Sequence, residues 1–416
     1  MKPLTDDKDV IQNTIEQSSK LGDVCYDIRG PALEEAKKLE AQGHKILKLN
    51  IGNPALFGFN APHKVLTNVS ENLRSAQGYS DSKGLLSARQ AVLEEYRNLD
   101  VPNIELNDIY LGNGVSELIT MAMQALLNNE DEVLVPMPDY PIWTASVRLS
   151  GGNPVHYICD EASDWYPSIT DIESKINPRT RAIVVINPNN PTGSVYSKNI
   201  LLDLIALARK YNLILFADEI YSKIVYDEAE YFPLASLSED VFTISFNGLS
   251  KSFRLAGFRS GWMIVSGPKY LAKSYIEGLE ILTNMRLCAN VPGQFAVQTA
   301  LSDHQSIKDL TLPGGRLKNQ RDVTWKLLNQ IPGVSCVKPK GAIYLFPKLD
   351  PMVFKIEDDT KFILDILQQK KILLVEGSAF NIKDKQHFRI VFLPEEELLS
   401  RAISQIKTVL DCYARR

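Results

Sequence analysis

The feature that most constrains the fold of this chain is a regular alternation of short apolar runs with amphipathic helical patterns, which begins near residue 108. The apolar runs are rich in Val and Ile and are bounded by Pro, Gly, Asn or Asp, as strands are. We therefore predict strands at 131–136, 153–160, 181–188, 213–220, 242–246 and 261–267. Helical patterns lie between and after them, at 116–129, at 197–212 and from Pro268 onwards. Because several strands are apolar almost without alternation, we predict an α/β fold whose mostly parallel sheet is covered by helices.

The length and the C-terminal third of the chain predict a second, smaller domain. A chain of 416 residues is too long for one ordinary core. Its last third holds three strand-like runs with helical segments between and after them, at 332–349, 371–380 and 387–394. We predict a large domain over 51–304 and a small α+β domain over 305–416. Residues 1–50 are expected to contribute to the small domain and to the mouth of the site.

Charge and composition argue against several classes of function. The net charge of −4 gives no reason to expect a nucleic acid or an anionic membrane as a partner. There is no apolar run of about 18 residues to span a membrane, and the polar N-terminus lacks a secretory signal. The five cysteines and five histidines are scattered, so we expect neither a metal site nor a disulfide framework. Such cysteine usage fits a cytoplasmic location best.

Polar residues follow several of the predicted strands, and their types suit one cofactor. Asn190, Asp218 and Tyr221 come at or after strand ends, and Lys251 lies just beyond another strand, with Arg259 close behind it. Ligands of open parallel sheets lie beyond the carboxyl ends of the strands, so one crevice is predicted to hold all of them. Pyridoxal phosphate needs an amine for its aldehyde, a carboxylate beside its ring nitrogen, and donors for its phenolate oxygen and phosphate. These residues supply such groups.

Four motifs carry a resemblance to a known family: NPNNPTG (187–193), ADEIY (217–221), SKSFRLAGFRSGW (250–262) and FRIVFLP (388–394). Through their order and spacing over nearly the whole chain, the sequence resembles the fold-type I, class I and II aminotransferases, which depend on pyridoxal phosphate. YDIRGP (26–31) and IYLGNGVSELI (109–119), among others, make it most similar to bacterial-type alanine (glutamate–pyruvate) aminotransferases. The resemblance implies a large-domain sheet of the seven-stranded type and a homodimer.

The resemblance implies a role for each residue around the cofactor ring. Lys251 would form the Schiff base and then move the proton that transamination shifts. Asp218 would pair with the ring nitrogen, while Tyr221 and Asn190 would hydrogen-bond the phenolate oxygen. Tyr140 would stack on the ring. The family pattern also implies a cis peptide bond between Asn190 and Pro191.

The phosphate is expected to bind at a helix N-terminus with added positive charge. The groups implied are the backbone of Gly114, Val115 and Ser116 and the side chains of Ser250, Arg259 and, from the neighbouring subunit of the homodimer, Tyr79. The sequence departs from the family at Gly248, where many relatives carry a phosphate-binding serine. The phosphate is therefore expected to depend more on Ser250, on Arg259 and on backbone N–H groups.

Arg389 matches the arginine that holds the α-carboxylate of the substrate, with Gly52 placed beside it and Asn190 and Tyr140 nearby. An enzyme that accepts both glutamate and alanine cannot keep a buried cation unpaired when alanine binds. We therefore expect a mobile partner for the side-chain carboxylate, and Arg29 is the candidate, with Tyr26 lining the same mouth. The alternative is that Arg29 only ties the N-terminal segment to the small domain.

These observations predict a transaminase that links alanine and pyruvate with glutamate and 2-oxoglutarate. An aromatic or diaminopimelate aminotransferase, or a carbon–sulfur lyase of the same fold, remains an alternative. A regulatory homologue without catalysis is a third, although the presence of Lys251 together with Asp218, Tyr221 and Arg389 argues against it.

Overall fold

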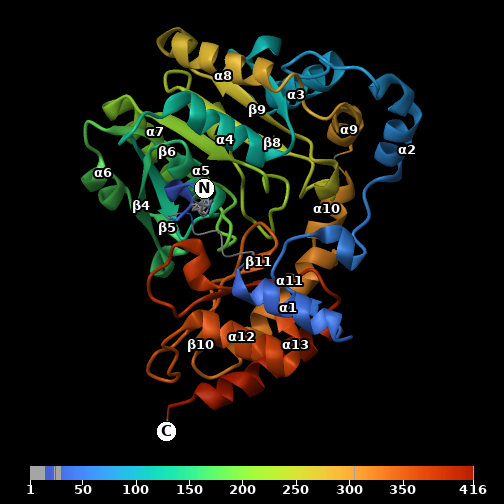
Figure 1. Ribbon diagram of the computed structural model, residues 1–416, viewed down its shortest axis with the longest axis vertical. Coiled ribbons are helices and arrows are strands. Elements are labelled where there is room, and N and C mark those ends of the chain that lie inside the picture. The colour runs from blue at the N-terminus through green and yellow to red at the C-terminus, as the bar shows by residue number, and fades with distance from the viewer. Residues whose placement is uncertain (1–14, 23, 25–29, 304, 416) are drawn as a thin grey trace, which may run out of the picture.

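The computed structural model describes residues 15–22, 24, 30–303 and 305–415. Within this part of the chain, eight strands form one sheet in the order β2-β9-β8-β7-β6-β3-β4-β5 (Figure 1). In chain order they are β2 (Ile109–Gly112), β3 (Glu132–Met137), β4 (Asn153–Asp160), β5 (Tyr166–Pro167), β6 (Thr180–Ile186), β7 (Ile214–Asp218), β8 (Thr243–Gly248) and β9 (Gly261–Ser266).

The sheet is mostly parallel, as predicted. Strands β4, β3, β6, β7 and β8 run parallel to one another, whereas β9 is antiparallel to both β8 and β2. These strands and β2 make the seven that the family resemblance implies. The two-residue strand β5 adds an eighth at the edge, antiparallel to β4.

Helices cover both faces of the sheet because successive side chains of each strand point to opposite faces. On β6, Ile183 and Val185 join one hydrophobic cluster, and Val184 and Ile186 join another. The first cluster includes residues of α6 (Ile169–Lys175) and α7 (Lys198–Tyr211), and the second includes residues of α4 (Val115–Leu126), α5 (Ile142–Leu149) and α8 (Lys273–Met285). Nearer to β2, the sheet packs against α2 (His63–Asn72), α3 (Leu86–Asn98) and α9 (Val291–Leu301).

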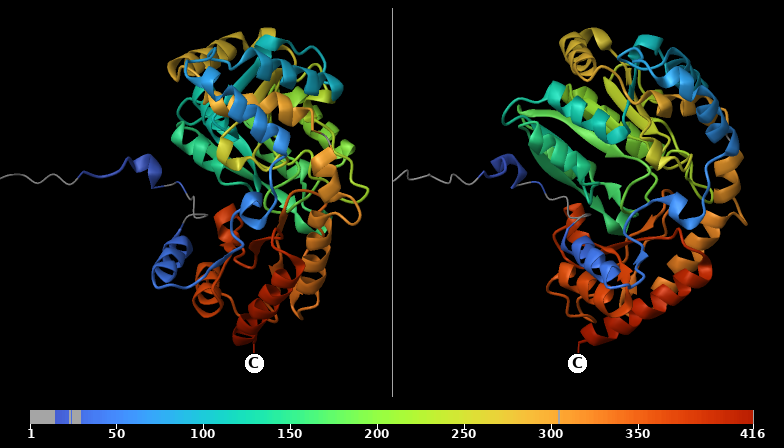
Figure 2. Two further views of the ribbon diagram at one scale, coloured as in Figure 1. Left: turned by 90° about the vertical axis from the view of Figure 1, so that its right-hand side faces the viewer. Right: turned by 45° about the vertical axis from the view of Figure 1, so that its right-hand side comes forward.

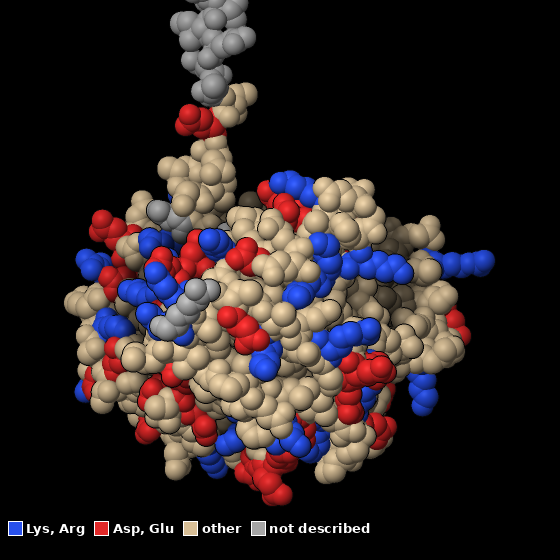
Figure 3. All heavy atoms as spheres, turned by 90° about the horizontal axis from the view of Figure 1, so that it is seen from below, with Lys and Arg blue, Asp and Glu red and all other residues tan. Residues whose placement is uncertain are grey.

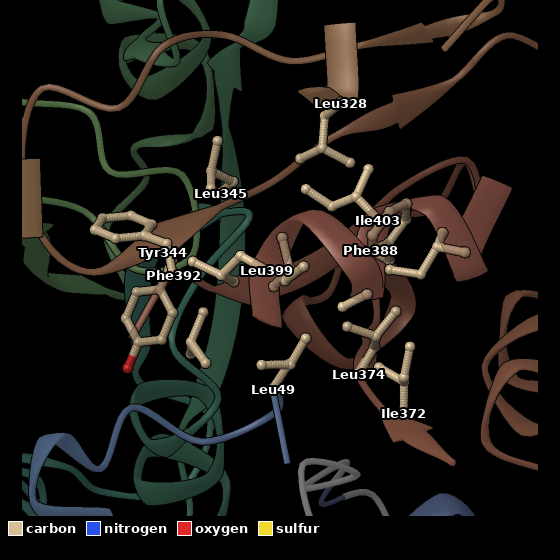
Figure 4. Close-up of a cluster of buried hydrophobic side chains, with 14 of the residues drawn as sticks. Leu49, Leu328, Tyr344, Leu345, Ile372, Leu374, Phe388, Phe392, Leu399 and Ile403 are labelled. Carbon is tan, nitrogen blue, oxygen red and sulfur yellow. The ribbon is translucent and has the colours of Figure 1, made fainter. Parts of the chain in front are cut away.

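The C-terminal part of the chain packs around a second core, part of which Figure 4 shows. Leu49, from the N-terminal part of the chain, lies in this core with Leu374, Leu399 and Ile403. Strand β1 (Leu47–Lys48) pairs in parallel with β13 (Ile372–Leu373). The other elements here are α1 (Pro31–Ala41), α10 (Gln305–Thr311), α11 (Arg316–Asn329), β10 (Val334–Ser335), β11 (Tyr344–Leu345), β12 (Lys348–Leu349), α12 (Asp359–Lys370), β14 (Val375–Glu376), β15 (Phe388–Val391) and α13 (Glu396–Leu410).

Two further views show how the parts are joined. The α10 and α11 helices, in orange, run along one side of the molecule from the sheet toward α12 and α13 (Figure 2). Seen from below, basic and acidic side chains are interspersed over the surface (Figure 3). Among the described residues, no helix combines the length and the apolar character that crossing a membrane requires. The predicted domain bounds stay a prediction.

Two details of the predicted elements were wrong. The helix expected from Pro268 begins at Lys273, because a 3-10 turn over Lys269–Ala272 comes first. The three strand-like runs of the C-terminal part are broken into short strands, of which only β15 exceeds two residues. Pro339 and Pro347 interrupt the first run, since proline cannot donate to a ladder.

Candidate active site

A cavity of about 450 Å³ lies beyond the carboxyl ends of β6, β7 and β8. Eleven of the fifteen residues predicted for the site line it: Gly52, Val115, Ser116, Tyr140, Asn190, Asp218, Tyr221, Ser250, Lys251, Arg259 and Arg389. Gly114 adjoins this lining through Arg259, whereas Tyr79 lies elsewhere with 81% of its surface exposed. Tyr26 and Arg29 lie outside the described residues.

Asp218 and Lys251 reach the cavity from adjacent strands. Asp218 ends β7 two residues after Phe216, so its side chain points to the same face as Phe216, toward α5. There the indole Nε1 of Trp143 donates to Asp218 Oδ2 over 3.0 Å. Burial raises the pKa of Asp218 to about 6, although this hydrogen bond and the charge of Lys251 act in the opposite direction. A cation placed against this carboxylate would favour its ionised form.

Lys251 follows β8 and turns back over the cavity. Its Nζ donates to the carbonyl oxygen of Gly52 over 2.8 Å and lies 5.9 Å from the centroid of the Tyr221 ring. A Cβ on Gly52 would overlap the Tyr344 hydroxyl and approach Ile343 Cδ1 to 2.6 Å. Glycine therefore keeps this carbonyl close to the amine.

The hydroxyl of Tyr221 is 2.7 Å from that of Tyr344, which sequence reasoning did not select. Although burial acts to raise the pKa of Tyr344, Lys251, Arg389 and the bond to Tyr221 hold it below its usual value. The pKa of Tyr221 is raised, mainly by burial and to a smaller extent by the neighbouring Tyr344. Tyr221 therefore keeps its proton, and its side chain lines the cavity.

The N-terminus of α4 lies at the cavity and has features that could bind an anion. Gly114, its N-cap, has a φ of 83° and supplies no side-chain cap, which leaves the first helical N–H groups without a side-chain acceptor. Arg259 packs against Gly114, and its guanidinium donates to the carbonyls of Ala256 (3.0 Å) and Asn113 (3.4 Å). Because these acceptors are neutral, the positive charge of Arg259 is not paired by them and is available to bind an anion.

The structure explains the departure at Gly248. Gly248 pairs with Gly261 across the β8–β9 ladder. A Cβ on Gly248 would approach both Gly261 Cα and Ser260 O to 2.9 Å, so a side chain would displace backbone. Ser250 and Arg259 line the cavity nearby.

Arg389 is a buried cation, only 2% exposed, that lines the same cavity. Its Nη1 donates to Asn190 Oδ1 over 2.9 Å, and its Nη2 donates to the carbonyl of Asn50. Its guanidinium carbon lies 4.3 Å from the Tyr344 ring centroid and 4.7 Å from that of Phe380. Among the described residues, Nε of Arg389 has no hydrogen-bond partner. A buried guanidinium whose protein acceptors are all neutral favours a bound carboxylate.

The predicted cis peptide bond between Asn190 and Pro191 is confirmed. Sequence reasoning missed Trp143, Tyr344 and Asn50, all of which contact predicted site residues. Trp143 could have been selected from the sequence, because it lies three residues after Tyr140 and a buried indole N–H needs a hydrogen-bond acceptor. Tyr344 lies in an apolar run that reads as core, and Asn50 contributes only a backbone carbonyl.

Comparison with known proteins identifies the family of the chain. Residues 44–406 match the family model described as aminotransferase class I and II. The chain therefore belongs to the class I and II aminotransferases. It is 60% identical over 399 residues to the glutamate-pyruvate aminotransferase AlaA of Escherichia coli K12, covering 96% of this chain and 98% of that protein. It is 57% identical over 403 residues to an alanine aminotransferase of Mycobacterium bovis, covering 97% and 94%. Among solved structures, an Escherichia coli aminotransferase matches with a TM-score of 0.95 and 59% identity, covering 97% of this chain and 100% of that one.

Proposed function

We propose that this chain catalyses transamination between L-alanine and pyruvate on one side and L-glutamate and 2-oxoglutarate on the other. The observation that carries the proposal is the meeting of the Lys251 amine, the Asp218 carboxylate and the Arg389 guanidinium in one cavity. The names of the relatives at 57% and 60% identity support the choice of substrates.

The residues of the cavity fit pyridoxal phosphate as cofactor. When bound, it supplies an aldehyde that captures the amino group and a ring that accepts electrons from the substrate Cα. The backbone at Gly114, Val115 and Ser116, together with Ser250 and Arg259, would hold its phosphate. Asp218 would face the ring nitrogen, and Tyr140 would cover the ring.

The catalytic work falls to side chains that already face the cavity. Lys251 Nζ would hold the cofactor aldehyde until the amino group of the substrate displaces it, and the freed amine would then take the proton from the substrate Cα. Asp218 would keep the ring nitrogen protonated, and Tyr221 and Asn190 would bind the phenolate oxygen. Arg389 holds the α-carboxylate through both arms of its guanidinium.

The side-chain carboxylate of glutamate requires a partner that withdraws when alanine binds. We keep Arg29 for this role, with Tyr26 beside it, although both lie outside the described residues. The motivation is physical: a permanently buried arginine with no anion would cost several kcal/mol in the alanine complex.

The assembly, the domain division and the location are also proposals. The 81% exposure of Tyr79 supports a homodimer in which this side chain reaches the phosphate bound by the partner copy. The pairing of β1 with β13 supports a small domain of residues 305–416 joined by the N-terminal segment, beside a large domain of 51–304. Cys159, Cys288, Cys336 and Cys412 are unpaired, as suits a cytoplasmic protein.

A panel of amino donors tests the proposed function. The purified protein, saturated with pyridoxal phosphate, is given alanine, glutamate, tyrosine and diaminopimelate in turn, with pyruvate or 2-oxoglutarate as acceptor. A cysteine-type donor is given without any acceptor. We expect the highest kcat/KM for alanine with 2-oxoglutarate. An aromatic or diaminopimelate donor ranked well above alanine would contradict the proposal, as would pyruvate released from a cysteine-type donor without any acceptor.

A further inference from the structure

Asp139 is a fully buried carboxyl group in the loop between β3 and α5, and the machinery described above does not use it. Its Oδ2 accepts a hydrogen bond from Thr144 Oγ1 over 2.7 Å, and its Oδ1 accepts one from Asn381 Nδ2 over 2.7 Å. Burial raises the pKa of Asp139 to about 7 against these two hydrogen bonds. A carboxyl group with 0% exposure destabilises a core unless donors face it, and here Thr144 and Asn381 supply those donors.

On the sheet side, Asp139 contacts the segment that carries two residues of the site. The next residue, Tyr140, lines the cavity. Thr144, which donates to Asp139, follows Trp143 in α5, and Trp143 donates to Asp218. Asp139 thus fixes the loop before α5 to the helix whose indole holds the Asp218 carboxylate.

On the other side, Asp139 binds the C-terminal part of the chain at the loop that supports Arg389. Its backbone N–H donates to the carbonyl of Phe380 over 3.1 Å, and its side chain accepts from Asn381. The Phe380 ring lies 4.7 Å from the guanidinium carbon of Arg389. Asp139 is therefore linked to two residues of the cavity lining, to Tyr140 as its neighbour in the chain and to Arg389 through Phe380.

We propose that Asp139 is a positioning residue, which through Thr144 and Asn381 fixes the cofactor-facing Tyr140 relative to the carboxylate-binding Arg389. The inference rests on the transamination proposed above. A shift of about 1 Å in the position of a side chain in such a site can lower the rate by about 100-fold. A link that fixes Tyr140 relative to Arg389 therefore matters for catalysis.

The test uses four single variants and one double variant of the full chain. Asp139→Ala removes the link, and Asp139→Asn is the conservative replacement, because its amide can bond both Thr144 and a flipped Asn381. Asn381→Gly removes the same link from the opposite side, and glycine keeps the backbone of Asn381, whose φ is 62°. Asp131→Ala is the matched control: Asp131 is also buried, 6% exposed, and precedes the same strand at its other end, where it binds Arg181.

For each variant we would measure kcat/KM for alanine and for glutamate, the affinity of the cofactor-free protein for pyridoxal phosphate by tryptophan fluorescence, and the unfolding midpoint. Asp139→Ala is expected to lower kcat/KM for both substrates by about 10- to 100-fold and to weaken cofactor affinity. Asp139→Asn should stay within about fivefold of wild type. Asn381→Gly should also lower kcat/KM. In the double variant with Asp139→Ala, kcat/KM should fall by less than about a further threefold, because the two substitutions remove the same link. Asp131→Ala should lower the unfolding midpoint and leave kcat/KM within about twofold.

The proposal is overturned if Asp139→Ala keeps kcat/KM within about twofold of wild type, or if Asp131→Ala loses as much. Losses that multiply in the double variant would also overturn it. Should Asp139→Ala fail to fold, Asn381→Gly decides, and wild-type kcat/KM in that variant refutes the link. A wild-type protein that does not use alanine would refute the proposed function instead, while the fluorescence titration would still compare Asp139→Ala with wild type.

Discussion

Replacing Arg389 tests the substrate site at its most buried charge. Two charge-assisted hydrogen bonds from its guanidinium to the substrate α-carboxylate are worth about 1.5–3 kcal/mol each, or together about 3–6 kcal/mol. At about 1.4 kcal/mol per factor of ten, Arg389→Met should therefore lower kcat/KM by about 10²- to 10⁴-fold. Arg389→Lys keeps the charge but not the two-pronged geometry, so its loss should be smaller, about 10- to 100-fold.

The loss should be the same for alanine and glutamate, because every amino-acid substrate carries the α-carboxylate. The assay is the rate of each half-reaction at several substrate concentrations, followed by the absorbance of the cofactor. Arg321→Met is a matched control, since Arg321 is also buried and lies 4.5 Å from the centroid of the Tyr226 ring. The carboxylates that pair with Arg321 belong to the protein itself: Nη2 lies 2.9 Å from Asp227 Oδ2 and 2.6 Å from Asp322 Oδ1.

Arg321→Met should lower the unfolding midpoint without changing kcat/KM per folded molecule, because no substrate group replaces its partners. The reasoning about Arg389 would be refuted if Arg389→Met kept kcat/KM within threefold of wild type. It would equally be refuted if the loss were confined to glutamate, since Arg389 would then bind the side-chain carboxylate.

Three further outcomes are expected. Gly248→Ser should weaken phosphate binding and lower the unfolding midpoint, because the new Cβ would lie 2.9 Å from the backbone of Gly261 and Ser260. An unchanged affinity for pyridoxal phosphate in a titration would contradict this close approach. Arg29→Ala should reduce kcat/KM for glutamate and 2-oxoglutarate far more than for alanine, and equal losses would remove Arg29 from the mechanism. In the cofactor-free protein, the raised pKa of Asp218 means that the folded state holds its proton more tightly than the unfolded state. Relative to Asp218→Asn, the free energy of unfolding of wild type should therefore fall as the pH rises from about 4 through about 6. Urea titrations that show the same difference between the two proteins at every pH would contradict this.

The sheet could be predicted from sequence because its strands are buried on both faces. An apolar run such as 181–188 ends where Asn and Pro begin, and the structure places β6 at Thr180–Ile186. The strands of the C-terminal part were harder to predict because they change partners. Strand β13 pairs with β1 and, after Leu374, β14 pairs with β15, so no long ladder follows the apolar run 371–380.

The candidate site was predictable where a strand end fixed the position of a side chain. Asp218 and Lys251 follow adjacent parallel strands, so the topology alone brings them to one edge of the sheet. Tyr344 could not be found this way, because it depends on how the C-terminal part packs against the sheet. Its bond to Tyr221 joins residues 123 positions apart in the chain, and no local pattern encodes such a pairing.

The most direct test of the whole account is to trap the lysine that holds the cofactor. The purified protein is saturated with pyridoxal phosphate, reduced with borohydride and digested, and its peptides are sequenced by mass spectrometry. We predict one phosphopyridoxyl group, on Lys251, and none there in Lys251→Ala. Modification of a different lysine, or no stable modification after saturation, would contradict the assignment of this cavity as the catalytic centre.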